Sequence, residues 1–215
     1  MMERQTGVIV VDVQGDFTEW KEGALAASYS EKGFVKQVES ATRSLQGAGF
    51  PICATQDWHP DDHLSFYTSH PGKKSFDTIE LDGRTQTLWP PHCVQGTPKA
   101  KILVDNNLFL AVVHKGMDKE FDSYSGFQDE GGKKTELEGI LRRNGIDRVI
   151  LYGVATDYCV QYTALDAVQA DFEVILIKDL CRGVAPDSSR KALENMEKEG
   201  VTIHDTLDMD EIKRL

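Results

Sequence analysis

The sequence predicts an α/β protein in which helices cover both faces of a mainly parallel sheet, a three-layer α/β/α sandwich. Apolar runs without polar alternation recur along the chain, which is typical of parallel strands buried on both faces. Segments with helical spacing lie between these runs, and this alternation implies right-handed crossovers. The 215 residues are 40% apolar and 27% charged, as expected for a globular domain.

Six runs are expected to form strands. The first, at 7–13, is apolar on both faces, as a central strand should be. Ligands in such sheets bind beyond the carboxyl ends of the strands, so polar residues at these ends are site candidates. The other runs cover 51–55, 109–113, 148–154 and 173–177, with a weaker one at 201–204.

Helices are expected between the strands. The first has apolar residues at helical spacing and ends at Gly47. Thr135 and Glu138 form a capping box at the start of the second. Asp187 is expected to cap a third helix, which Gly200 closes.

Residues 56–108 interrupt this alternation. The segment is rich in histidine, proline and aromatic residues and shows little helical period. Long loops inside compact domains are usually functional or disordered, and the aromatic residues argue for order. We therefore expect a single domain over 1–215 with a metal-binding loop insertion at about 56–108.

Charge and cysteine content limit the partners. The net charge is −11 and no basic patch offsets it, which excludes nucleic acid and anionic membrane surfaces as partners. No apolar run reaches the ~18 residues that a membrane helix requires. The four cysteines lack CxxC spacing, so we expect free thiols in the cytoplasm, with Cys53, Cys93 and Cys181 as packing residues. The sequence leaves the oligomeric state open, a homo-oligomer included.

Three polar residues follow predicted strands and suggest nucleophilic chemistry. Asp12, Lys115 and Cys159 stand at carboxyl ends that converge in this architecture. Cys159 begins a predicted helix, whose amides and dipole favour thiolate over thiol, and Lys115 would favour it further. Asp12 supplies a proton acceptor, and the small residues Gly153 and Ala155 let backbone N–H groups approach an oxyanion. These groups together indicate acyl transfer from an amide or ester.

A second group lies in the long segment. Asp57 and His59 are two apart at the end of an extended run, so they point to the same side and can hold one ion. His92 can complete a His/His/carboxylate set, which suits zinc, iron(II) or manganese. His63 is also near in sequence. The alternative for each histidine is a hydrogen-bonded structural role, and the residues alone do not decide between them.

These segments together resemble the nicotinamidase family of cysteine hydrolases, within the isochorismatase-like superfamily. They occur in the family's order and cover most of the chain. One departure is Gly15, where many members carry asparagine. The matching segments are 11–17, 56–60, 89–97, 114–116, 122–127 and 153–160.

The resemblance implies a fold, a catalytic triad and a metal site. The fold would contain a six-stranded parallel sheet. The triad would be Asp12, Lys115 and Cys159, and a divalent metal, with Zn²⁺ expected first and Fe²⁺ or Mn²⁺ as alternatives, would be held by Asp57, His59 and His92. In some members a further histidine, matching His63 here, also reaches the metal.

The resemblance also implies an activity, the hydrolysis of nicotinamide to nicotinate and ammonia in NAD salvage, with pyrazinamide as a second substrate. Phe17 and Trp89 would sandwich the ring, and Tyr124 and Val154 would also bind the substrate. A cis peptide between Val154 and Ala155 would aim the amides of Ala155 and Cys159 at the oxyanion.

Other classes of protein fit less well. A related amidase or ureidohydrolase acting on N-carbamoyl compounds would generally lack the metal set. An aspartyl phosphotransferase would need aspartate at position 14, where Gln14 stands. A nucleotide-binding module would need G-x-G-x-x-G after the first strand, which is absent. A non-catalytic interaction domain does not explain the triad.

Overall fold

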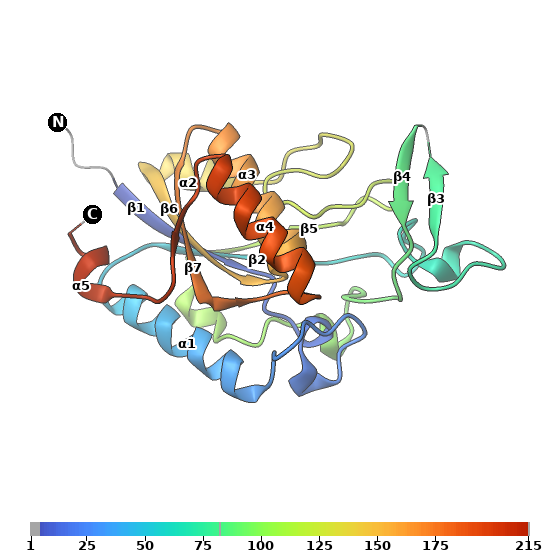
Figure 1. The fold of residues 1–215 in the computed structure, drawn as a ribbon, viewed down its shortest axis with the longest axis horizontal. Coiled ribbons are helices and arrows are strands. Elements are labelled where there is room, and N and C mark those ends of the chain that lie inside the picture. Colours follow the sequence, from blue (N-terminus) through green and yellow to red (C-terminus); the bar gives the residue numbers. More distant parts are fainter. Residues whose placement is uncertain (1–4, 82, 215) are drawn as a thin grey trace.

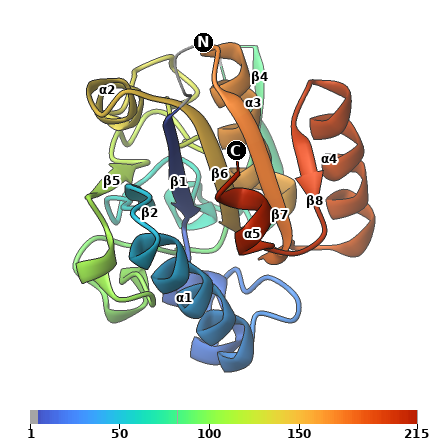
Figure 2. The same ribbon diagram turned by 90° about the vertical axis from the view of Figure 1, so that its left-hand side faces the viewer.

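A computed structural model describes residues 5–81 and 83–214. Its main sheet has six strands in the order β5-β2-β1-β6-β7-β8, and every neighbouring pair is parallel (Figure 2). The predicted fold class is confirmed. The strands are β1 (Gln5–Val11), β2 (Ile52–Asp57), β5 (Ala111–Lys115), β6 (Ile146–Val154), β7 (Glu173–Arg182) and β8 (Thr202–His204).

Helices lie on both sides of this sheet. Figure 1 shows α2, α3 and α4 above it and α1 below it. In α1 the apolar side chains at helical spacing are buried, as the sequence predicted. Among the described residues, no helix has the length and apolarity that a membrane crossing would need. The helices are α1 (Lys32–Gly47), α2 (Leu137–Arg143), α3 (Gln161–Gln169), α4 (Pro186–Lys198) and α5 (Met209–Ile212).

Two predicted helix caps are wrong. The N-cap of α4 is Ala185, and Asp187 lies inside the first turn, because Pro186 occupies the first helical position. Helix α2 begins at Leu137, whose backbone N–H donates to Thr135 Oγ1 at 3.2 Å, while Glu138 pairs with a lysine instead of completing a capping box.

The long segment contains more regular structure than its pattern indicated. A two-stranded antiparallel hairpin, β3 (Thr78–Leu81) and β4 (Arg84–Thr87), stands apart from the main sheet at the right of Figure 1. The Asp-Gly pair at 82–83 is the sequence signal for such a hairpin. No residue of either strand is fully buried, so the alternation of apolar and polar residues that predicts a strand is weak here.

The core of the sheet brings the strand ends together. Residues 8–11 of β1 are at most 1% exposed because strands and helices cover both of its faces. The β2–β5 register places Asp57 directly opposite Lys115. Asp12 follows β1 with a φ of 46°, in the left-handed region that is unusual for a non-glycine residue. The carboxyl ends of β1, β2, β5 and β6 therefore converge on one edge.

Candidate active site

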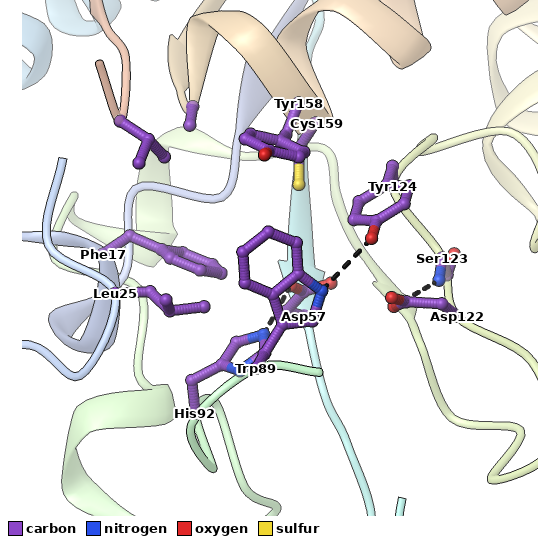
Figure 3. A pocket seen from close by; sticks show the side chains of 12 residues that line it. Phe17, Leu25, Asp57, Trp89, His92, Asp122, Ser123, Tyr124, Tyr158 and Cys159 are labelled. Atoms are coloured by element: carbon purple, nitrogen blue, oxygen red, sulfur yellow. Dashed lines mark hydrogen bonds and ion pairs between the residues drawn. The ribbon is translucent and has the colours of Figure 1, made fainter. Parts of the chain in front are cut away.

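A cavity opens at this edge of the sheet (Figure 3). Seven of the residues predicted from the sequence line it, and five further residues were not predicted. The predicted ones are Phe17, Asp57, Trp89, His92, Tyr124, Ala155 and Cys159, and the others are Leu25, Asp122, Ser123, Tyr158 and Val184.

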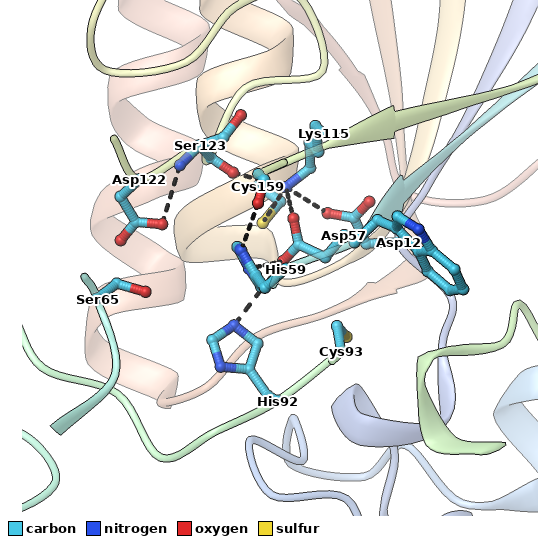
Figure 4. A network of polar contacts seen from close by, with 12 residues as sticks. Asp12, Asp57, His59, Ser65, His92, Cys93, Lys115, Asp122, Ser123 and Cys159 are labelled. Atoms are coloured by element: carbon cyan, nitrogen blue, oxygen red, sulfur yellow. Dashed lines mark hydrogen bonds and ion pairs between the residues drawn. The ribbon is translucent and has the colours of Figure 1, made fainter. Parts of the chain in front are cut away.

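Lys115 lies at the centre of a buried polar network (Figure 4). Its ammonium Nζ is 3.0 Å from Asp12 Oδ2 and 3.4 Å from Cys159 Sγ. The same nitrogen is 2.5 Å from Asp57 Oδ1 and donates to the carbonyl of Ser123 at 2.8 Å. The sulfur and the nearest carboxylate oxygens of Asp12 and Asp57 lie within 4.8 Å of one another. The three residues predicted as a triad are thus brought together.

Local structure holds the two ends of this network. Asp12 Oδ1 accepts a hydrogen bond from the Thr55 hydroxyl at 2.7 Å, which fixes the carboxylate. Cys159 lies in a π-helical turn, Thr156–Val160, that leads into α3, so the nucleophile does not sit on a regular α-helical start. The peptide between Val154 and Ala155 is cis, as expected.

The charges around the sulfur contradict one expectation. Burial raises the pKa of Cys159 well above its ordinary value, and although Lys115 opposes this, Asp12 and Asp57 add to it. The resting group is therefore a neutral thiol and not a thiolate. The helix dipole and Lys115 can be inferred from the sequence, whereas burial of the thiol beside two carboxylates cannot.

The same environment prepares Asp12 to accept a proton. Burial raises its pKa, and Asp57 adds to this, while Lys115 opposes it. Burial lowers the pKa of Lys115, but Asp12 and Asp57 more than reverse that effect, so the ammonium stays charged. A carboxylate with a raised pKa is a stronger base toward a thiol.

We predict that Cys159 in chelator-treated protein reacts slowly with iodoacetamide at neutral pH and faster as the pH rises above 9. Because Asp12 raises the pKa of the thiol, Asp12→Asn should move this profile to lower pH. Mass spectrometry of the Cys159 peptide over a pH series measures both effects. A wild-type thiol that is fully reactive at pH 7 would contradict the assignment of a neutral resting group.

A group of metal-binding type adjoins this network. Asp57 Oδ2 lies 3.5 Å from His59 Nε2 and 3.9 Å from His92 Nε2, and all three side chains are buried. Each imidazole is oriented by its other nitrogen, since His59 Nδ1 is 2.9 Å from the Gly116 carbonyl and His92 Nδ1 is 2.9 Å from the Pro90 carbonyl. An Nδ1–H that donates to a carbonyl leaves the Nε2 lone pair free for a metal. These residues fit a divalent cation.

His63 lies beside this group without joining it. Its ring centroid is 4.4 Å from that of His59. However, Nδ1 is 2.8 Å from the Ser65 hydroxyl and Nε2 is 3.2 Å from the Phe121 carbonyl. Both ring nitrogens thus have protein partners, and His63 contacts the group through the His59 ring.

Aromatic side chains form the walls of the cavity. Trp89 Nε1 donates to the Tyr124 hydroxyl at 3.1 Å, and the Tyr158 ring packs against Trp89 at 5.3 Å with its plane perpendicular. Phe17 lies 5.5 Å from the His92 ring. Val154, the last residue of β6, is not part of the lining, because its side chain is fully buried in the hydrophobic core. Its expected contact with substrate is therefore not supported, whereas Ala155 does line the cavity.

The sequence could have indicated some of the unpredicted residues but not others. Tyr158 is next to the predicted nucleophile Cys159, so its place near the site could have been predicted. Ser123 contributes its carbonyl to Lys115, a backbone contact that no residue type reveals. Asp122 accepts from Gln86 Nε2 at 2.9 Å, and this contact depends on where the β3–β4 hairpin packs.

A parallel α/β sheet that buries a thiol against an ammonium group and a carboxylate defines the class of the protein as a cysteine hydrolase. The comparison of its sequence with family models gives a match to the isochorismatase domain over residues 6–208. The chain belongs to the isochorismatase family.

Individual relatives are more specific. The chain is 40% identical over 212 residues to a nicotinamidase of Escherichia coli (strain K12), covering 95% of this chain and 96% of the relative. A nicotinamidase/pyrazinamidase structure from Acinetobacter baumanii matches with a TM-score of 0.83 and 38% identity, covering 94% of this chain and 97% of that one. A pyrazinamidase of Pyrococcus horikoshii in complex with zinc matches with a TM-score of 0.78 and 38% identity, covering 93% and 98%.

Proposed function

We propose that this protein is a nicotinamidase, which hydrolyses nicotinamide to nicotinate and ammonia and so serves NAD salvage. One observation carries the proposal: the two oxygens of Asp57 face two different groups. Oδ1 contacts Lys115 beside the Cys159 thiol, and Oδ2 faces the imidazoles of His59 and His92. A ring nitrogen at the imidazole side and a carboxamide at the thiol side would span this arrangement in one small molecule.

The walls of the cavity support a flat aromatic substrate. Phe17 and Trp89 would hold the ring between them, while the hydrogen bond from Trp89 to Tyr124 keeps the indole in place. A divalent cation held by Asp57, His59 and His92 would bind the pyridine nitrogen and orient the ring. Holding the carboxamide carbon beside Cys159 in this way removes much of the entropic cost of the attack.

The chemistry then follows from the charges of the network. Asp12 takes the proton of the Cys159 thiol as the sulfur attacks the carboxamide carbon, and Lys115 stabilises the anionic groups around it. The amides of Ala155 and Cys159 hold the oxyanion. Asp12 returns the proton to the departing ammonia, a C–N bond breaks and a thioester remains. A water molecule, deprotonated by Asp12, then cleaves the thioester to release nicotinate and restore the thiol.

The breadth of the reaction follows from the same geometry. Pyrazinamide has a ring nitrogen in the same position relative to its carboxamide, so we propose it as a second substrate. Zinc is the proposed ion, supported by the zinc complex of the Pyrococcus horikoshii relative. An N-carbamoyl amidase is the alternative, and the Asp57/His59/His92 group disfavours it. Location in the cytoplasm stays a prediction from the sequence.

The test of the proposal is ammonia release from nicotinamide by purified protein, with and without a chelator. We expect turnover that the chelator abolishes and added Zn²⁺ restores. N-carbamoyl compounds serve as the competing substrates in the same assay. Turnover of these compounds with none of nicotinamide would replace the proposal with the alternative.

We predict that His92→Ala loses most of its bound metal and raises the KM for nicotinamide by about tenfold or more, since even the loss of a residue that only hydrogen-bonds to a metal ligand weakens metal binding by about 10–100-fold. Elemental analysis and steady-state kinetics measure the two effects. His204→Ala is the control, because His204 lies on β8 away from the cavity. Unchanged metal content in His92→Ala would transfer the ligand role elsewhere, with His63 the next candidate.

A further inference from the structure

Asp157 is a buried carboxylate for which the mechanism above has no use. It lies two residues before Cys159 in the Thr156–Val160 turn and is 8% exposed. It is not among the residues that line the cavity, and its hydrogen bonds go to a neighbouring segment of the chain. An acidic side chain held this close to a nucleophile needs another explanation.

The Asp157 carboxylate accepts hydrogen bonds from one short segment. Oδ1 accepts from the backbone N–H of Val184 at 2.9 Å, and Oδ2 accepts from that of Ala185 at 3.3 Å and from the Ser188 hydroxyl. Ala185 is the N-cap of α4 and has no side chain able to cap it. Asp157 therefore binds the backbone N–H groups of the two residues that precede α4 and one hydroxyl in its first turn.

The segment that Asp157 holds is also a wall of the cavity. Val184 lines the cavity together with Phe17 and Leu25. On its other side the segment is fixed by Ser28, whose N–H donates to the Gly183 carbonyl at 3.0 Å and whose hydroxyl donates to the Val184 carbonyl at 3.3 Å.

The segment that carries Val184 lies close to the turn that carries Cys159. A Cβ added to Gly183 would lie 3.1 Å from Asp157 Oδ1, and it would also require Ser189 Oγ, 1.8 Å away, to move. Asp157 belongs to this turn and accepts from the Val184 N–H, so its side chain links the position of Cys159 to that of the cavity wall.

We propose that Asp157 is a positioning residue that fixes the Cys159 turn against the Val184 wall, and so controls both the attack geometry and the size of ring accepted. The inference rests on the proposed function for its substrate, but the placement of the sulfur can be tested without any substrate. Three donors converge on one carboxylate, and charge-assisted hydrogen bonds of this kind are stronger than neutral ones. A misplacement of about 1 Å at a reacting centre costs about 100-fold in rate.

The first test compares Asp157→Asn with Asp187→Asn. Both remove one negative charge near the start of α4, but Asp187 is exposed in the first turn of that helix, whereas Asp157 is buried in the turn that carries Cys159. In Asp157→Asn an amide NH₂ faces N–H and O–H donors, so at least one contact breaks. We expect kcat/KM for nicotinamide to fall by about 100-fold in this variant and to change by less than about twofold in the control.

Two further measurements separate positioning from simple helix capping. The ratio of kcat/KM for 5-methylnicotinamide to that for nicotinamide should rise in Asp157→Asn, because the Val184 wall is released. The alkylation rate of Cys159 by iodoacetamide, measured by mass spectrometry at one pH, should change by about threefold or more, since the sulfur moves relative to Lys115 and Asp12. If Asp157 only stabilised the start of α4, Asp157→Asn would lower the melting temperature and leave both of these measurements unchanged.

Ser188→Ala gives a milder version of the same change, since it removes one of the three donors and leaves both backbone contacts. We expect kcat/KM, the substrate ratio and the alkylation rate to change in the same direction but by less. If Asp157→Asn does not fold, this variant provides the test. Folded variants with wild-type selectivity and wild-type Cys159 alkylation would overturn the proposal. If wild-type protein releases no ammonia from nicotinamide, the proposed function fails, while the alkylation measurement still tests Asp157.

Discussion

Cys159→Ala is expected to abolish turnover of nicotinamide, by about 10⁴-fold or more, while the protein stays folded. Loss of a covalent nucleophile typically removes almost all of the rate, and only binding and oxyanion stabilisation remain. Alanine is smaller than cysteine by one sulfur atom, so the vacated space is small. Ammonia release and the melting temperature, measured on the same preparation, test both parts.

Cys53→Ala is the matched control for this variant. Cys53 is also buried but lies within β2 and does not line the cavity. We expect it to retain activity within about twofold and to lose some stability, as large-to-small core changes do. Retained turnover in Cys159→Ala, with Cys53→Ala also active, would remove Cys159 from the chemistry.

Lys115→Met is expected to lose both activity and stability, because the ammonium compensates two buried carboxylates. Removing one partner of a buried ion pair costs about 3–5 kcal/mol, since the remaining charge is left uncompensated. Here Asp12 and Asp57 would both be left, and the rate should fall by about 10³-fold or more as the base and the nucleophile lose their arrangement. Urea unfolding and ammonia release measure the two losses.

The pH dependence of this variant identifies the cause. Lys115 is the main group that lowers the pKa of Asp12 and Asp57. The pKa of Asp12 is raised even with Lys115 present, and without Lys115 it rises further, so the folded state binds more protons than the unfolded chain. Stability is then greatest at low pH and is lost as the pH rises through the folded values. Lys115→Met should therefore be less destabilised at pH 5 than at pH 8.

Lys134→Met is the control for charge removal. Lys134 is largely exposed and pairs with Glu138 at 2.9 Å, a contact expected to contribute less than about 1 kcal/mol. Its removal should leave activity unchanged and stability nearly so, at either pH. A Lys115→Met protein that matched this control in stability would contradict the role given to the buried ammonium.

The sequence predicts the sheet because its strands are buried on both faces. Runs such as 7–13 and 148–154 contain little but apolar residues, and this pattern survives without knowledge of their neighbours. The convergence of Asp12, Lys115 and Cys159 follows from the same architecture, since the carboxyl ends of parallel strands meet at one edge. This part of the site is therefore a consequence of topology.

Other features of the site depend on contacts between residues that are far apart in the sequence, and these cannot be predicted from it. The contact of Asp57 with Lys115 arises from the β2–β5 register. The raised pKa of Cys159 depends on complete burial beside two carboxylates, which outweighs the ammonium. The start of α4 is held by Asp157, which is distant in the sequence and binds the two residues before the helix, so a local capping rule selected Asp187 instead.

The central claim is that Cys159 forms a covalent thioester with the substrate, and rapid-quench mass spectrometry tests it most directly. Excess enzyme is mixed with nicotinamide, stopped with acid at intervals within the first turnover, and digested. We predict that a nicotinoyl group appears on the Cys159 peptide before nicotinate accumulates and then decays. Formation of nicotinate while Cys159 remains unmodified at every interval, or a nicotinoyl group on a different residue, would contradict it.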